Sequence, residues 1–312
     1  MAKRNGGIIG KVNTPTTSTA TGVWRLQDQF NAKKNSIWPS TPYSIDFLVI
    51  AGGASGGGED GGGGGAGGFR TSTQSVTPGV AITVTVGDGG ASIVTGGIGY
   101  IGNPGIASSI SGSGLTTISS AGGGGGGGSG LSGVNGGSAG GGYREFGAGT
   151  GNTPSTSPSQ GNNGGAGSTV SPQFGGGGGG AGGAGNAGSP GTGVGGAGLA
   201  SSITGSSVTR AGGGGGMNIG GGAALGGSGG GGNGGSASAS SATDATINTG
   251  SGGGGSSDPA QPGSYAGAGG KGVVILSMPS ANFSGTVTGS PTESTSGANK
   301  ILVFNGSGSY TT

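Results

Sequence analysis

The chain of 312 residues contains no cysteine and no histidine, and only 6% of its residues are charged. Without cysteine, no disulfide can hold the fold. Without histidine, the commonest general base and the commonest zinc ligand are both missing. The nine carboxylates are scattered and offer no specific acid–base pair. We therefore expect a protein that is not an enzyme and that binds no metal and no cofactor.

Apolar residues are also scarce. They make up 28% of the chain, which is too little for an ordinary hydrophobic core at this length. No stretch approaches the roughly 18 apolar residues that a membrane-spanning helix needs. The basic start of the chain, MAKRN, lacks the apolar region of a secretory signal. We expect a protein made in the cytoplasm that does not insert into a membrane.

Glycine takes the place of these residues, with 95 of the 312 positions. A glycine run has no side chains with which to build a core, and it loses much backbone freedom on ordering. The runs are therefore either flexible linkers or segments held by their main chains. Collagen is excluded, because there are only 13 prolines and no sustained triplet repeat. The longest run covers residues 122–128, and shorter ones cover 61–65, 175–180, 212–216, 229–232 and 252–255.

A polyproline-II-type helix can order such runs. It has three residues per turn and no internal hydrogen bonds, so its amides and carbonyls point outwards. Buried groups of this kind must be paired, and without Cβ atoms neighbouring helices can approach closely on every side. Each hydrogen bond contributes about 0.5–1.5 kcal/mol net, similar to the entropy lost per residue. We expect a sandwich or bundle of polyglycine-II helices that is stable only as a cooperative block.

Short strands flank the glycine runs in the sequence. Residues 44–51 and 271–278 are mostly apolar, which predicts strands buried on both faces. Residues 80–86 alternate with period two, and residues 115–121 lead directly into the longest glycine run. The predicted fold is mostly irregular and β, with a polyglycine-II sandwich or bundle, flanking short strands and one short N-terminal helix.

An internal repeat supports an architecture built by stacking. Residues 105–113 (GIASSISGS) reappear as residues 198–206 (GLASSITGS), and each copy leads through a short strand into a glycine run. We divide the chain into an N-terminal attachment segment (1–40), a glycine-rich domain (41–278) and a small C-terminal β element (279–312).

The N-terminal segment is basic and contains the one expected helix. Residues 1–38 hold six basic residues and one acidic residue (6 − 1 = +5), whereas the remainder holds five basic and eight acidic (5 − 8 = −3). Val23, Leu26 and Phe30 form an apolar stripe, with Thr21 as the expected N-cap and Pro39 as a barrier to continuation. We expect this arm to dock on an acidic protein surface rather than on nucleic acid; a plain solvated tail is the alternative. The attachment residues are Trp24, Leu26, Phe30, Lys33, Lys34 and Trp38.

Loops with side chains separate the glycine runs and are expected to gather at the ends of the bundle. They cover residues 143–146, 152–163, 168–174, 236–251 and 256–265. Aromatic and arginine anchors carry most binding energy at interfaces, and function concentrates in loops on a rigid scaffold. The alternative is that these side chains fill local gaps. The adjacent Glu59 and Asp60 are expected to form a solvated turn rather than a cation site. The predicted binding residues are Tyr143, Arg144, Phe146, Phe174 and Tyr265.

Several of these segments resemble a known family. The pattern FLVIAGG at 47–53, the glycine-rich stretch that ends in Phe69-Arg70 and the closing strand at 272–275 are similar to glycine-rich domains of bacteriophage tail-fibre and adhesin proteins. Residues 22–39 resemble N-terminal segments of marine phage structural proteins, and residues 300–311 resemble a β element that accompanies these domains.

The resemblance implies a virion protein at the end of a tail fibre or another external fibre. Its polyglycine-II sandwich would present variable loops to a receptor on the host surface, either a protein or a glycan. Residues 1–40 would bind other virion or tail proteins, and the implied oligomer is a homotrimer. One alternative is a non-adhesive structural or decoration protein of the virion. A remote alternative is an ice-binding protein with regular threonine-bearing faces.

Overall fold

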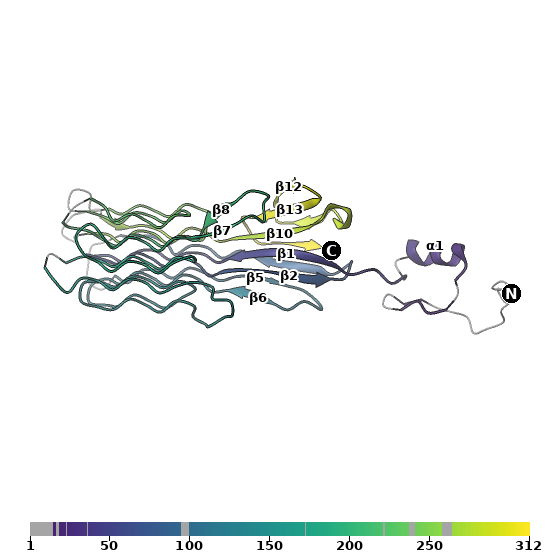
Figure 1. Ribbon diagram of the computed structural model, residues 1–312, viewed down its shortest axis with the longest axis horizontal. Coiled ribbons are helices and arrows are strands. Elements are labelled where there is room, and N and C mark those ends of the chain that lie inside the picture. Colours follow the sequence, from purple (N-terminus) through teal and green to yellow (C-terminus); the bar gives the residue numbers. More distant parts are fainter. Residues whose placement is uncertain are drawn as a thin grey trace.

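The computed structural model describes residues 15–16, 19–22, 24–35, 37–94, 100–171, 173–220, 222–236, 241–257 and 264–312. Figure 1 shows an elongated body, with most of the strands at one end and glycine segments running side by side to the other. The helix α1 (Leu26–Lys34) lies beyond the strand end, on the side away from the far turns of the glycine segments. The body therefore has two different ends.

Five antiparallel strands form what we call the central sheet. Because β1 and β10 lie next to each other in its middle, β10 is buried as far as Met278 and β1 is buried from Phe47 to Ile50, as their apolar sequences predict. The order across the sheet is β12 (Thr292–Ser296), β13 (Asn299–Phe304), β10 (Val273–Pro279), β1 (Tyr43–Ile50) and β2 (Phe69–Val76).

A second five-stranded sheet, the outer sheet, packs on one face of the central sheet. Two smaller two-stranded sheets, β4–β9 and β7–β8, and a 3-10 turn at Ser280–Asn282 complete the secondary structure of the described residues. The outer sheet has the order β11 (Thr286–Thr288), β14 (Gly308–Thr311), β3 (Ala81–Thr85), β5 (Ser108–Ser111) and β6 (Ile118–Ser120). The small sheets pair β4 (Ile93–Val94) with β9 (Tyr265–Ala266), and β7 (Leu199–Ser201) with β8 (Val208–Arg210).

Two hydrophobic cores lie on opposite faces of the central sheet. The first fills the space between the two large sheets, where Phe47 and Leu276 pack with Ile110 and Tyr310. The second lies on the other face and contains Leu48, Ile50, Phe69, Val273, Ile275 and Ile301, together with alanines of the glycine segments. Successive side chains of a strand point to opposite faces of the sheet, so neighbouring residues of β1, such as Phe47 and Leu48, belong to different cores.

The internal repeat supplies one hairpin to each face. The first copy leads into β5 and β6 of the outer sheet, and its Ile110 belongs to the first core. The second copy leads into β7 and β8, and its equivalent residue, Ile203, packs against the second core. The two copies of the repeat therefore cover the central sheet from opposite sides, and each then continues into a glycine segment.

The central glycine segment, residues 61–68, uses its amides with a period of three. Starting from Gly62, every third amide donates to carbonyls of residues 121–127. The next set donates to residues 176–179, and the third set, which includes Gly61, donates to residues 250–256. These hydrogen bonds span 2.8–3.0 Å between nitrogen and oxygen. This threefold outward pattern is the one expected of a polyglycine-II helix.

The carbonyls of residues 61–68 reach three further neighbours. They accept amides from residues 51–57, 138–141 and 214–217, at 2.8–3.1 Å. The segment is thus surrounded by six others, which is the arrangement of hexagonally packed rods. We call residues 61–68 the central rod. The predicted polyglycine-II bundle is confirmed, and the linker alternative fails for the described glycine runs.

Close approach explains why these positions are glycine. A Cβ atom added to Gly63, Gly64 or Gly65 would lie closer than 3.0 Å to a carbonyl oxygen of a neighbouring rod. Ala66 is accommodated at 0% exposure because its methyl group joins the second core. In the central rod, a side chain is therefore accommodated at Ala66, which meets the second core, and excluded at Gly63, Gly64 and Gly65, which meet other rods.

Sequence reasoning located some elements and missed others. The strands predicted at 44–51, 80–86, 115–121 and 271–278 are confirmed as β1, β3, β6 and β10. It missed β2 and β12, whose sequences, FRTSTQSV and TESTS, are too polar to stand out. The strands that follow residue 279 are parts of the two large sheets, since β13 pairs with β10 and β14 pairs with β3.

The N-terminal helix is shorter than predicted. It begins at Leu26 after Arg25, which makes no side-chain capping hydrogen bond, so the prediction that Thr21 caps it is wrong. Leu26 and Phe30 are 83% and 61% exposed, and Ala32 is the buried residue of the helix. Val23 of the expected stripe lies outside the described residues.

Candidate functional site

Turns of the glycine rods meet at the end of the bundle farthest from the large sheets. We call this end the tip and define it by residues 58–61, 128–131, 143–146, 167–171, 173–174 and 217–220. Backbone hydrogen bonds connect these turns: the Gly167 amide donates to Phe146, and the Met217 amide donates to Gly61. A β-bridge joins Phe174 to Asn218. The tip is therefore a continuous surface built from turns that are far apart in the sequence.

An ion pair joins two of the tip turns. The Arg144 guanidinium donates to Asp60 Oδ2 through Nη2 at 2.6 Å and through Nε at 3.2 Å. Burial lowers the pKa of Arg144, but the hydrogen bond and the charge of Asp60 outweigh burial and leave this pKa above its usual value. Asp60 is nearly covered, whereas Arg144 keeps about a third of its side chain exposed. The pair fixes the turn at 143–146 against the turn of the first rods.

Tyr143 and Phe146 pack beside this ion pair. Their ring centroids are 6.0 Å apart, and the Arg144 guanidinium lies 4.9 Å from the Tyr143 ring centroid. Tyr143 is buried, and this burial raises the pKa of its phenol, against the lowering effect of the Arg144 charge. Phe146 is only half-buried. The cluster thus has a buried support, Tyr143, and two partly exposed side chains, Arg144 and Phe146.

The backbone at this cluster is in the left-handed region. Glu59, Asp60 and Arg144 have φ values of 56°, 55° and 43°, a conformation that costs a non-glycine residue of order 1–3 kcal/mol. Glu59 Oε2 is buried without a hydrogen-bond partner among the described residues. These turns therefore hold polar side chains in positions that local backbone preference does not favour.

The remaining two predicted binding residues lie in different surroundings. Phe174 is only 1% exposed, and its ring packs beneath the turn at Gly220. Tyr265 is 40% exposed in β9, where it pairs with Val94 of β4. The structure therefore brings Tyr143, Arg144 and Phe146 into one cluster, whereas Phe174 is buried within the tip and Tyr265 is exposed in the pair of β4 and β9.

Exposed aliphatic side chains at the tip were missed by the sequence analysis. Leu131, Val170 and Ile219 each lie in a different tip turn and are 44%, 70% and 37% exposed. A lone aliphatic residue between glycines is the signal that could have identified them, since such a residue has no local core to join. Together with Phe146 and Arg144, these residues give the tip several exposed or partly exposed apolar side chains and one positively charged side chain.

One predicted loop does not belong to the tip. Residues 152–163 lie at the sheet end, where Gln160 binds the Ala121 amide through its side chain and accepts the Phe69 amide at its carbonyl. Gln160 is 1% exposed and also donates to the Pro154 carbonyl. This loop therefore links the bundle to the central sheet. The loops predicted at 236–251 and 256–265 lie partly outside the described residues.

The predicted attachment residues lie at the opposite end of the molecule. Trp24 and Trp38 bracket α1 and meet edge to face, with ring centroids 5.2 Å apart. The indole Nε1 of Trp24 is buried without a hydrogen-bond partner among the described residues. Lys33 and Lys34 are exposed in the last turn of the helix, where positive charge interacts favourably with the helix dipole.

The described part of the chain offers little for chemistry that depends on metals. Within it, no group of three or more Asp and Glu side chains is placed to hold a metal ion. None of the helices in this part has the length and apolar character needed to cross a membrane. What the tip can supply is a rigid surface of apolar, aromatic and cationic side chains.

Comparison with known proteins agrees with this architecture. None of the curated proteins matches the chain significantly. A family model described as a glycine-rich domain matches residues 31–279, from within α1 to the end of β10. This match covers most of the chain and all of its rods, and the chain therefore belongs to the glycine-rich domain family.

Proposed function

We propose that this protein is a tail-fibre or fibre-tip protein of a bacteriophage virion, which binds the host surface through the tip of its glycine bundle. The observation that carries the proposal is the polarity of the molecule: the tip lies at one end of the rods, and α1 lies beyond the sheets at the other end (Figure 1). An adhesin on a fibre needs this arrangement, with one end for anchoring and one for binding.

The bundle suits the role of a stiff support. From residue 51 to residue 58, the first rod extends roughly 22 Å at about 3.1 Å per residue. Its position is fixed by main-chain hydrogen bonds to the neighbouring rods. Because side chains contribute little inside the bundle, tip residues can change without repacking a core. This property favours a receptor-binding surface that adapts to different hosts.

The exposed side chains at each end support the assignment of roles. Aromatic residues and arginine are enriched at binding hot spots, and Phe146 and Arg144 are partly exposed at the tip. At the other end, the exposed Leu26 and Phe30 stripe lies in a segment of net charge +5 (6 − 1). We propose that this segment docks on an acidic virion protein and that copies of α1 associate into a trimer.

A matched pair of triple variants tests the proposal. The tip variant combines Leu131→Ser, Val170→Ser and Ile219→Ser. The control variant makes the same kind of change at three exposed aliphatic residues away from the tip, Ile106, Leu199 and Ile247. Purified, fluorescently labelled protein is applied to a panel of bacterial isolates, and binding is measured by flow cytometry.

We expect the unmodified protein to bind at least one isolate. The tip variant should lose more than about tenfold in binding, because each truncated anchor costs on the order of 1 kcal/mol, while the control variant should bind normally. Equal losses in the two variants would contradict a tip-specific site. Binding to no isolate, together with incorporation of the protein along the shaft of a virion, would favour the non-adhesive structural alternative.

A further inference from the structure

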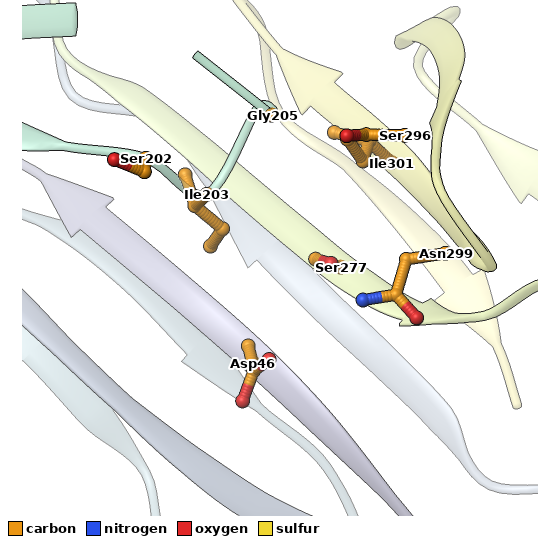
Figure 2. A pocket seen from close by; sticks show the side chains of 8 residues that line it. All are labelled: Asp46, Ser202, Ile203, Gly205, Ser277, Ser296, Asn299 and Ile301. Atoms are coloured by element: carbon orange, nitrogen blue, oxygen red, sulfur yellow. The ribbon is translucent and has the colours of Figure 1, made fainter. Parts of the chain in front are cut away.

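A small hollow lies on the face of the central sheet that carries the second core, far from the tip. It has a volume of about 160 Å³ and is covered on one side by the turn that connects β7 to β8 (Figure 2). Because β7 and β8 form a two-stranded sheet of their own, their turn lies over the central sheet without being hydrogen-bonded into it. The hollow is the space left between them.

Strand register brings polar side chains to the floor of this hollow. Asp46 of β1 lies opposite Ser277 of β10, and Ser277 lies opposite Ile301 of β13. One pair further along, Asn299 lies opposite Ser296. These residues occupy the same face as the second core, so this face changes from apolar near the rods to polar toward the start of β1.

The polar groups of the hollow are available for a ligand. Ser277 is only 5% exposed, and its hydroxyl makes no hydrogen bond within the described chain. The side chains of Ser202, Ser296 and Asn299 likewise have no hydrogen-bond partner among the described residues. Asp46 accepts one hydrogen bond from Thr73, at 2.5 Å, through Oδ1. These hydroxyl, amide and carboxylate groups therefore keep hydrogen-bonding capacity that a ligand in the hollow could use.

The lining residues decide which chemistry fits. No basic side chain lines the hollow, so it does not suit a phosphate or a carboxylate. One carboxylate is too few for a divalent cation, which takes six or more oxygen ligands. The hydroxyls and the amide donate and accept hydrogen bonds, the carboxylate accepts them, and the half-buried Ile203 adds a small aliphatic surface. This combination matches a polyhydroxylated ring, which has hydroxyls at its edge and C–H groups on its face.

The size of the hollow agrees with one such ring. A cavity of about 150 Å³ holds benzene, and a hexopyranose has about twice as many non-hydrogen atoms. The hollow has a volume of about 160 Å³ and is open on one side, so one edge of such a ring would enter it and the opposite edge would remain in the opening. We propose that it binds a single neutral hexopyranose unit. The ring would lie against Ile203, and its hydroxyls would bond to Ser277, Asn299 and Asp46. This site does not rest on the function proposed for the tip.

Gly205 keeps the mouth of the hollow open. It has a φ of +91°, and a Cβ atom added there would lie closer than 3.0 Å to the side chain of Ser296. The turn therefore needs glycine both for its backbone conformation and for the space above Ser296. This residue has no role in the glycine bundle.

The test uses the full chain and ligand-detected saturation-transfer NMR. The probes are the methyl glycosides of glucose, galactose, mannose and N-acetylglucosamine, with glucuronic acid as a negatively charged comparison. Ser277→Ala removes the hydroxyl at the floor of the hollow, and Ser277→Leu fills the hollow. Ser294→Ala is the matched control, because Ser294 lies on the same sheet outside the lining of the hollow. Thermal unfolding of each variant establishes that it is folded.

We expect saturation transfer to at least one neutral glycoside and little to glucuronic acid, which Asp46 repels. Ser277→Ala should weaken binding by about three- to tenfold, as for the loss of one hydrogen bond. Ser277→Leu should abolish binding, and Ser294→Ala should leave it unchanged. The absence of transfer to every neutral glycoside would overturn the proposal. Transfer that persists in a folded Ser277→Leu variant would also overturn it.

Discussion

The replacement Gly64→Ala tests whether close contact between main chains holds the bundle together. Gly64 lies in the middle of the central rod, where a Cβ atom would come closer than 3.0 Å to the carbonyl oxygens of Ala54 and Ser55. Carbon atoms in ordinary contact are about 3.5–4.0 Å apart, so the segment at residues 51–57 would have to move by about 1 Å.

The cost follows from the hydrogen bonds that this movement breaks. The amides of Ala51, Ala54 and Gly57 donate to the central rod at 2.9–3.1 Å, and a shift of about 1 Å takes them outside hydrogen-bonding range. Each lost bond costs on the order of 1 kcal/mol, and more where a buried group is left unpaired. We expect Gly64→Ala to lower the free energy of unfolding by about 3–6 kcal/mol.

Gly147→Ala is the matched control. A Cβ atom at Gly147 would meet no atom within 4 Å, and its φ is not positive. The same chemical change should therefore alter the free energy of unfolding by less than about 1 kcal/mol. Guanidinium denaturation followed by circular dichroism measures both variants, and the melting temperature of Gly64→Ala should fall by about 6–15 °C. Equal denaturation midpoints for the two variants would refute the close-contact explanation.

Four further substitutions test the sheets and the helix. Ile110→Ala should lower the free energy of unfolding, measured by chemical denaturation, by about 2–5 kcal/mol because it leaves a cavity in the first core. Ile203→Ala, at the equivalent position of the second repeat copy, should lower it by roughly half as much because Ile203 is only half-buried. Burial, followed by the hydrogen bond with Tyr310, raises the pKa of Tyr43. The contribution of Tyr43 to the free energy of unfolding is therefore complete below the unfolded-state pKa of about 10 and declines as the pH rises beyond it. Tyr43→Phe should flatten this decline when urea unfolding is measured across that pH range, and an unchanged pH dependence would contradict a raised pKa for Tyr43. Phe30→Ser should leave the melting temperature unchanged because the side chain is exposed, but it should reduce self-association in sedimentation velocity, and an unaltered oligomer would count against assembly through α1.

The sequence was sufficient to predict the rods but not their arrangement. A glycine run can be buried only if its main chain finds partners, so composition alone indicates polyglycine-II packing. The neighbours of each rod cannot be predicted in this way, because glycine carries no side chain to specify a neighbour. In the structure, pairing is guided by turns, by strands such as β1 and by rare residues such as Ala66, whose methyl group must reach the second core.

The tip was only partly predictable for a similar reason. Aromatic residues in glycine-rich loops suggest binding, yet Tyr143 and Phe174 are buried because they are large enough to fill the gaps between turns. Val170, a smaller residue that attracts less notice, is the more exposed one. Whether a side chain fills a gap or faces solvent depends on neighbouring turns that are distant in sequence, and a single sequence does not reveal them.

The threefold pattern of the central rod restricts how such a bundle can change in length. Because every third amide returns to the same neighbour, inserting one or two residues would turn all the following amides toward the wrong partners. Inserting three residues would preserve every pairing and lengthen the rod by roughly 9 Å, provided that adjacent rods gain the same number. The reach of the tip can therefore grow only in whole steps of three residues, made in several rods together.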